Sequence, residues 1–175
     1  MRLRVEQLEA HLKKSLLPAY LVTGDEPLQL GEACDAIRSA ARTAGHDNRE
    51  VMEAGAGFDW NRLGAEAASF SLFAEKKIID LRIPNGKPGR EGGKALVGYC
   101  ENPPSDTLLL LTLPKLERAQ QSAKWLKAID SLGAVIQVWP VEARQLPQWL
   151  ERRMHQAGLQ PTREAVQLLA ERVEG

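Results

Sequence analysis

The stretch LVTGDEPLQLGEACDAI (21–37) contains several of the residue types from which phosphate-binding loops are built. It reads as an apolar strand, a glycine turn and a helix, so that backbone amides at the start of the helix could hold an anion. A P-loop also needs the pattern G-x-x-x-x-G-K-[ST], because its lysine supplies positive charge and its hydroxyl binds Mg²⁺. In GDEPLQLGE the two glycines are too far apart, and the second is followed by glutamate.

The four residues of the turn, Gly24, Asp25, Glu26 and Pro27, are unfavourable for nucleotide binding. The two carboxylates would repel a triphosphate, and proline has no amide hydrogen to donate. We interpret this degenerate loop as an ordinary helix start, with an acidic residue near the positive end of the helix dipole and Pro27 in the first turn. We therefore expect no nucleotide cofactor at this position.

A second glycine-rich stretch, GREGGKA (89–95), also lies between an expected strand and an expected helix. Its glycines are one position too close for a P-loop, and Ala95 stands where Ser or Thr is required. We predict a surface loop, which could still contact phosphate through Lys87, Arg90 and Lys94.

Other catalytic patterns are also missing from the sequence. Nucleotide hydrolysis requires an acidic pair at the end of a neighbouring strand, but the strand TLLLLTL (107–113) is followed by Pro114 and Lys115. The three histidines are isolated and do not have the spacing of metal ligands. Cys34 falls on the apolar face of its helix and is predicted to lie in the core. We expect neither catalytic residues nor a metal.

Short apolar segments alternate with amphipathic helical patterns five times, which is typical of a parallel, doubly wound α/β sheet flanked by helices. The expected strands are 19–24, 49–54, 76–83, 107–113 and 133–140. The leucine-rich strand is predicted to be central, and the weaker strand 49–54 to lie at an edge. Two helical patterns follow Pro140. We therefore predict an α/β domain over 1–140 and the start of a small helical domain over 141–175.

The composition of the 175 residues is that of an ordinary globular protein. Lys+Arg and Asp+Glu both number 23, and this zero net charge disfavours a dedicated DNA-binding protein. The two cysteines are far apart, which suits a reducing cytoplasm. The N-terminal segment lacks the features of a signal peptide, and no run reaches the roughly 18 apolar residues that a membrane span needs. We expect a cytoplasmic protein that does not contact a membrane.

The segment ASFSLFAEKK (68–77) contains an unusual pair of large apolar residues. If the helix that begins near Trp60 continues through it at about 100° per residue, Leu72 lies opposite the core face and Phe73 about a quarter turn away. An exposed apolar pair usually marks a partner surface. The alternative is that the helix ends at Ser69 and both side chains turn back beneath the sheet. The pattern alone leaves both interpretations open.

Four stretches of the chain resemble, in order and spacing, the delta subunit of the bacterial DNA polymerase III clamp loader. They are AYLVTGDEPLQL, ASFSLFAEKKIIDLRIP, TLLLLTLPKLERAQQSAKW and QLPQWLERRMHQAGL. The resemblance extends from the first helix to Gly175. It implies a five-stranded AAA+-like (P-loop NTPase-like) sheet with the order 5-1-4-3-2 and no functional nucleotide site. It also implies an N-terminal fragment, because the family's chain continues into a helical collar domain.

In that family the delta subunit binds the beta sliding clamp and opens the ring, so that it can be loaded on DNA during replication. The resemblance makes Leu72 and Phe73 the plug that enters the clamp, with Ser71 and Phe70 shaping its tip. It implies no intrinsic ATPase activity in this subunit of the DNA polymerase III holoenzyme, because ATP acts on other subunits.

The resemblance also implies further partners for the chain. The gamma/tau and delta-prime subunits are expected to bind through the missing C-terminal domain, and primer–template DNA only within the assembled complex. The expected location is the nucleoid-associated replisome in the bacterial cytoplasm.

Two other functions remain open from the residues alone. One is a nucleotide-dependent phosphotransferase or ATPase with an atypical phosphate site, and measurable ATP turnover would favour it. The other is a DNA-binding module that uses the loop 86–94, and steeply salt-dependent binding to naked DNA would favour it.

Overall fold

The computed structural model describes residues 1–69 and 76–173. The chain divides into two compact units, Met1–Val138 and Trp139–Gly175. The first unit is an α/β sheet flanked by helices, and the second contains helices alone.

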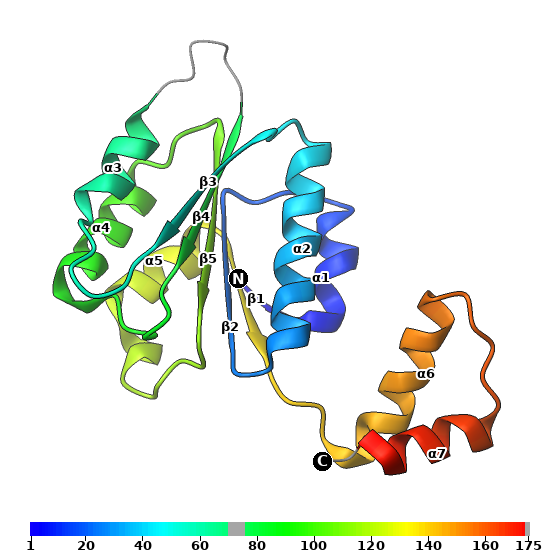
Figure 1. Ribbon diagram of the computed structural model, residues 1–175. Helices are drawn as coiled ribbons and strands as arrows, with labels where there is room; N and C mark the ends of the chain where they lie inside the picture. Colours follow the sequence, from blue (N-terminus) through cyan, green and yellow to red (C-terminus); the bar gives the residue numbers. More distant parts are fainter. Residues whose placement is uncertain (70–75, 174–175) are drawn as a thin grey trace. The chain divides into compact units, whose positions relative to one another are not determined.

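The sheet of the first unit has six strands, all parallel, in the order β1-β6-β2-β5-β4-β3 (Figure 1). The strands are β1 (Arg2–Arg4), β2 (Ala19–Gly24), β3 (Asn48–Glu53), β4 (Lys77–Arg82), β5 (Thr107–Leu113) and β6 (Ala134–Val138). The predicted parallel α/β class is confirmed, and the five expected strands have the expected order, with β5 inside the sheet and β3 at an edge.

The prediction of five strands is wrong, because β1 adds a sixth at the edge beside β6. Arg2 pairs with Val135 and Arg4 with Gln137, and the Val135 amide donates to the Met1 carbonyl oxygen at 2.8 Å. A strand of three residues is too short to show an alternating pattern. Its pairing with a distant strand therefore left no local signal in the sequence.

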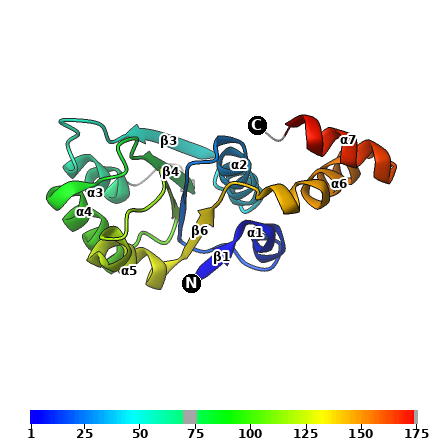
Figure 2. The same cartoon turned by 90° about the horizontal axis from the view of Figure 1, so that it is seen from below.

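Helices cover both faces of the sheet (Figures 1 and 2). One face carries α1 (Val5–Leu12) and α2 (Pro27–Thr43). The other face carries α3 (Asn61–Ala68), α4 (Gly89–Glu101) and α5 (Lys124–Leu132). A short 3₁₀ turn, Gln120–Ser122, precedes α5.

The start of α4 corrects the predicted surface loop, because GREGGKA (89–95) is helical from Gly89. Gly92 faces the indole ring of Trp60, and a Cβ atom at this position would lie only 2.4 Å from the ring. The glycines that suggest a loop in the sequence therefore include one that lets α4 approach the start of α3 closely.

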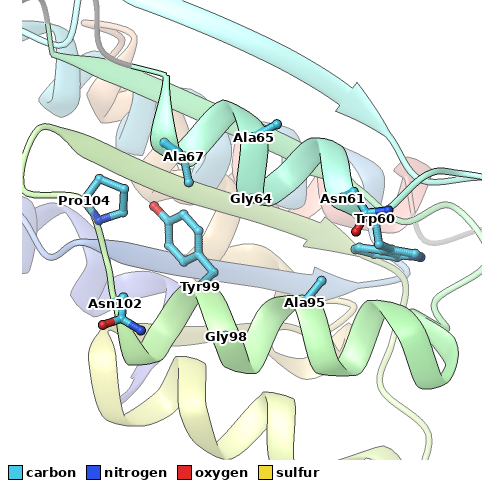
Figure 3. A pocket seen from close by; sticks show the side chains of 11 residues that line it. Trp60, Asn61, Gly64, Ala65, Ala67, Ala95, Gly98, Tyr99, Asn102 and Pro104 are labelled. Atoms are coloured by element: carbon cyan, nitrogen blue, oxygen red, sulfur yellow. The ribbon is translucent and has the colours of Figure 1, made fainter.

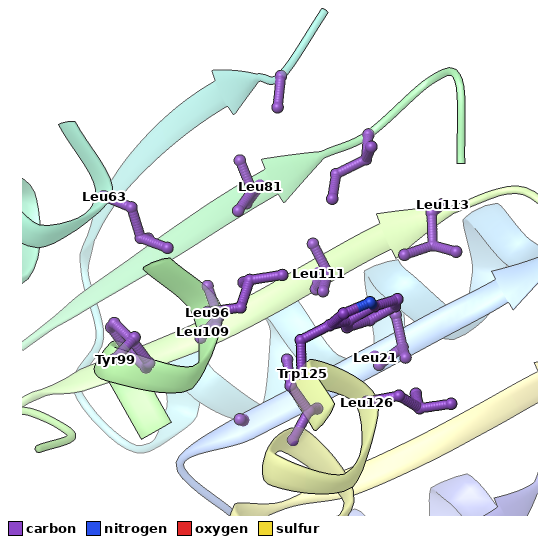
Figure 4. Close-up of a cluster of buried hydrophobic side chains, with 14 of the residues drawn as sticks. Leu21, Leu63, Leu81, Leu96, Tyr99, Leu109, Leu111, Leu113, Trp125 and Leu126 are labelled. Atoms are coloured by element: carbon purple, nitrogen blue, oxygen red, sulfur yellow. The ribbon is translucent and has the colours of Figure 1, made fainter. Parts of the chain in front are cut away.

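The alternation of side chains along the strands divides the core into two layers. In β2, β4, β5 and β6, odd-numbered residues such as Leu21, Leu81 and Leu111 pack against α3, α4 and α5 (Figure 4). Even-numbered residues such as Val22 and Leu110 pack against α1 and α2. Because β5 is buried on both faces, its sequence is nearly continuous leucine, as expected for a central parallel strand.

The second unit contains the 3₁₀ turn Ala143–Gln145, α6 (Leu146–Gln156) and α7 (Arg163–Val173). Val166 and Ala170 of α7 are buried, whereas Leu168, Leu169 and Val173 are exposed. None of the helices in the described parts of either unit is long and apolar enough to cross a membrane.

A buried carboxylate connects α2 to the β3–β4 edge of the sheet. Asp80 of β4 is fully buried, and its Oδ2 accepts from Arg38 Nε at 3.0 Å and from Arg49 Nη2 at 2.6 Å. A third guanidinium, that of Arg82, lies 3.6 Å from Oδ1. Buried charges require such partners, because loss of one partner leaves the other uncompensated in a low-dielectric environment.

We expect Asp80→Asn to lower the free energy of unfolding by about 3 kcal/mol or more, because two partly buried arginines lose their counter-charge. The matched control is Asp35→Asn. Asp35 also pairs with Arg38, at 2.6 Å, but its side chain is 77% exposed, so a loss below about 1 kcal/mol is expected. Urea unfolding followed by circular dichroism measures both. Equal losses would contradict this account of Asp80.

Candidate functional site

The carboxyl ends of β2, β4 and β5 meet at one edge of the sheet, where α/β proteins usually bind their ligands. A pocket of about 430 Å³ lies at this edge. Its lining is mainly apolar and includes Pro27, Leu30, Ile83, Pro84 and Leu113. The pocket thus occupies the usual place of a nucleotide but offers little polar surface to phosphate.

The N-terminus of α2 is capped by a carboxylate of its own chain. Glu26 accepts hydrogen bonds from the amides of Leu28 at 3.3 Å and Gln29 at 2.7 Å. In a P-loop these amide positions face the phosphates. The Glu26 side chain therefore occupies the position of the anion, and a phosphate would have to displace it against its negative charge.

Asp25 fixes the same turn to the neighbouring strand connection. Its Oδ1 accepts from the Lys115 amide at 2.9 Å, just beyond β5. The Thr23 hydroxyl donates to the Pro114 carbonyl oxygen at 2.6 Å in the same region. The acidic residue that appeared only to repel phosphate thus also has a structural role in joining β2 to β5.

The two glycines of the loop have different roles. A Cβ atom on Gly24 would lie 2.3 Å from the Val138 carbonyl oxygen, because β2 and β6 approach closely at this pair. A Cβ atom on Gly31, within α2, would meet none of the described residues within 4 Å. Strand packing explains the first glycine without a bound phosphate, and the second has no steric requirement.

The basic residues near 86–94 are accompanied by acidic residues. Lys87 Nζ lies 2.8 Å from Glu117 Oε1, and Lys94 Nζ lies 3.3 Å from Glu91 Oε1. Arg90 lies in the first turn of α4. These contacts reduce the local positive potential that binding to naked DNA requires.

Cys34, His11 and His46 are among the residue types that could act as a nucleophile or a metal ligand, but each has a structural partner within the fold. Cys34 is buried, as predicted, and burial raises the pKa of its thiol, an effect only partly offset by the Thr112 hydroxyl. His11 Nε2 lies 3.1 Å from the Tyr20 hydroxyl, and His46 Nδ1 donates to the Ala41 carbonyl oxygen at 3.1 Å. Among residues 1–69 and 76–173, no cluster of three His, Cys, Asp or Glu side chains could hold a metal.

Helix α3 ends at Ala68, and Ser69 already has an extended backbone. The interpretation in which this helix continues through 68–77 is therefore wrong. The predicted clamp-binding residues Phe70, Ser71, Leu72 and Phe73 lie outside the described residues, as does the whole range 70–75.

A buried lysine joins the two ends of the chain that flank 70–75. Lys77, the first residue of β4, has a side chain that is only 6% exposed. Its Nζ donates to Ser69 Oγ at 2.7 Å and to the Ser69 carbonyl oxygen at 2.9 Å, and it pairs with Glu66 Oε1 at 3.1 Å. The sequence does not predict the contact of Lys77 with Ser69 and Glu66, because two adjacent lysines usually face the solvent.

A second hollow, of about 440 Å³, lies between α3 and α4 (Figure 3). Small residues such as Gly64, Ala67 and Ala95 line it together with Tyr99. The Tyr99 hydroxyl is buried without a hydrogen-bond partner among the described residues, and burial raises its pKa, so the side chain stays neutral. The described residues that line this hollow thus offer no charged group for chemistry.

Gly24 and Gly31 of the degenerate loop provide a test of the strand-packing role that the structure gives to Gly24. We expect Gly24→Ala to destabilise the protein by about 2 kcal/mol or more, because the new methyl group overlaps the backbone of β6. The matched change Gly31→Ala should be neutral or stabilising by up to about 1 kcal/mol, because alanine favours a helix. Thermal unfolding measures both. A tolerated Gly24→Ala would contradict the strand-packing role.

Comparisons with known proteins identify the relatives of this chain. A family profile described as "DNA polymerase III, delta subunit" matches residues 20–138. The chain is 31% identical over 175 residues to DNA polymerase III subunit delta of Escherichia coli, covering 100% of this chain and 51% of that protein. It is 28% identical over 173 residues to the subunit delta of Haemophilus influenzae, covering 96% and 49%. The chain thus spans about half the length of these curated relatives.

Solved structures show the same fold. The Bacillus subtilis DNA clamp loader delta protein (YqeN) superimposes with a TM-score of 0.71 at 20% identity, covering 94% of this chain and 51% of that chain. A RuvB variant from Thermotoga maritima superimposes with a TM-score of 0.54 at 13% identity, covering 95% and 53%. The first unit therefore has the AAA+-like fold that the resemblance implied. The profile match covers more than half of the sequence, and the chain belongs to the DNA polymerase III delta subunit family.

Proposed function

We propose that this chain is the N-terminal part of a non-catalytic clamp-loader subunit, which binds the beta sliding clamp and opens the ring for loading on DNA. The family match over most of the α/β unit carries this proposal. The geometry of the degenerate loop supports it, because the helix end that would hold a phosphate is capped by Glu26. A protein of this kind acts by binding a partner.

We propose that the clamp contact is made by the apolar pair Leu72 and Phe73, with Phe70 and Ser71 beside it. Burial of two such side chains is worth roughly 2 kcal/mol each. This gain can anchor a micromolar complex when polar contacts at the rim add to it. In the sequence this segment comes directly after Ser69, where the backbone has already left α3.

Ring opening by such a contact needs no chemistry in this subunit. A protein that binds the open clamp more tightly than the closed clamp shifts the population toward the open form. The shift is limited by the difference between the two affinities. ATP would then act on other subunits of the loader, which control when this surface is available.

The remaining partners belong to the complete loader. We propose that the gamma/tau and delta-prime subunits bind to the part of the family's chain that lies beyond this sequence, and that primer–template DNA is contacted only in the assembly. We also propose that the residues after Val138 begin the small helical domain that follows the AAA+-like domain in this family.

The proposal predicts direct binding of this chain to the sliding clamp without nucleotide. The double variant Leu72→Ala/Phe73→Ala should lose about 100-fold or more in affinity, because it removes both apolar anchors. Isothermal titration calorimetry with purified clamp, with and without ATP, measures this.

The control is the double variant Leu168→Ala/Leu169→Ala, which truncates exposed apolar residues of α7 instead. It should bind the clamp as the unchanged chain does, and circular dichroism should show that both variants remain folded. Equal binding by the Leu72/Phe73 variant, or a dependence of binding on ATP, would contradict the proposal. Measurable ATP hydrolysis by the chain alone would favour a nucleotide-dependent enzyme instead.

A further inference from the structure

We infer that Lys77 is a positioning residue for clamp binding, and that it acts by fixing together the two ends of the chain that flank 70–76. The inference rests on the proposed function of Leu72 and Phe73, and it names a residue that the clamp itself does not need to touch. It is carried by the contacts among Lys77, Ser69 and Glu66.

The Lys77 ammonium group is surrounded by oxygen atoms from the end of α3. It donates to the Ser69 hydroxyl and carbonyl oxygens at 2.7 and 2.9 Å, and it pairs with Glu66 Oε1 at 3.1 Å. It also donates to the Glu66 carbonyl oxygen. Within the described part of the chain, oxygen atoms of two residues are thus enough to satisfy all the donors of a lysine whose side chain is almost fully buried.

These oxygen atoms lie at the C-terminus of α3, where a positive charge is stabilising. The last four carbonyl groups of a helix have no partner within it, and the helix dipole leaves partial negative charge at this end. Lysine side chains near a helix C-terminus can donate to these carbonyls. Lys77 performs this role from β4, so that the cap of α3 comes from beyond the segment 70–75.

The other end of the contact is fixed in the sheet. The Lys77 amide donates to the Asp106 carbonyl oxygen at 2.9 Å, and Lys77 is paired with Asn48 and Thr107 on either side. The ammonium group therefore holds the end of α3 to a rigid strand. It fixes the distance between Ser69 and Lys77 at the point where the intervening chain leaves and rejoins the fold.

Fixed ends reduce the number of conformations open to the intervening residues. Closing a chain segment has an entropic cost, and binding is stronger when this cost has already been met in the free protein. Loss of the contact should therefore weaken clamp binding even though the apolar anchors remain. This loss of clamp affinity should be smaller when Leu72 has already been replaced, because Lys77 acts through the segment that carries Leu72.

Lys76 provides a matched control. It lies next to Lys77 and carries the same charge, but it is exposed, and its Nζ donates to the Ala44 carbonyl oxygen at 3.2 Å, away from α3. If positive charge near the segment simply attracted the clamp, Lys76→Met and Lys77→Met would have similar effects. If the contact with Ser69 and Glu66 matters, only Lys77→Met should weaken binding.

The experiment measures clamp affinity by titration for the unchanged chain and for Lys77→Met, Lys76→Met and Lys77→Arg. We expect Lys77→Met to weaken binding about tenfold, Lys76→Met to change it by less than about threefold, and Lys77→Arg to restore most of the affinity. In a Leu72→Ala background, Lys77→Met should cause a clearly smaller further loss, because the two changes act on one contact.

Amide hydrogen exchange across 70–76 in the free chain provides a readout that does not use the clamp. Exchange should be faster in Lys77→Met than in the unchanged chain or in Lys76→Met. If Lys77→Met does not fold, Ser69→Ala replaces it, since this change leaves the lysine in place and removes one of its acceptors together with the hydrogen bond from the Ser69 hydroxyl to the Glu66 carbonyl oxygen. A smaller loss of affinity and the same direction of exchange are then expected.

The outcomes separate the inference from the proposed function. If the unchanged chain does not bind the clamp, the proposed function fails, and the role of Lys77 in clamp binding fails with it. If the unchanged chain binds and Lys77→Met, or Ser69→Ala in its place, binds equally well, the inference is overturned while the proposed function stands. If Lys76→Met and Lys77→Met lose clamp affinity equally, the effect of Lys77 comes from attraction by its positive charge, and the positioning role is overturned.

Discussion

The common direction of the six strands is the constraint on which the arrangement of this protein depends. Parallel strands need helical crossovers, which here cover both faces of the sheet, bury β5 on both sides and explain its run of leucines. They also bring all carboxyl ends to one edge and all amino ends to the other. The degenerate loop after β2 lies at the carboxyl edge, whereas Lys77 begins β4 at the amino edge. The turn at the usual nucleotide position and the start of β4, which follows the proposed partner-binding segment in the sequence, are thus at opposite edges of the sheet.

This separation gives the degenerate loop a physical explanation. The architecture of a nucleotide-binding domain keeps its strand, turn and helix because these elements hold the sheet together. The features that would bind phosphate are replaced by contacts within the chain: Glu26 caps α2, Asp25 joins the turn to Lys115, and Gly24 lets β2 and β6 approach. We propose that the fold serves here as a rigid support for a surface at the other edge.

The sequence predicts those features of the fold that repeat along the chain. The parallel α/β class, the central place of the leucine-rich strand and the core position of Cys34 follow from patterns several residues long, whereas the full strand order was implied only by the family resemblance. Features made by contacts between distant residues are not visible in this way. The strand Arg2–Arg4 depends on β6, the close approach of α4 to α3 involves Gly92 against Trp60, and the burial of Lys77 depends on the end of α3. In the site, the sequence pointed to the segment that carries Leu72 and Phe73 but left open whether the preceding helix continues through it or ends near Ser69, and the structure ends α3 at Ala68.

Hydrogen–deuterium exchange on this chain, alone and with the sliding clamp in the absence of nucleotide, tests the central claim most directly. The account predicts that the clamp slows exchange in peptides that cover 68–77 and leaves the peptides around Gly24 and Pro114 unchanged. Slower exchange at the carboxyl edge of the sheet, with no change at 68–77, would show that the partner binds at the degenerate loop and would contradict the account.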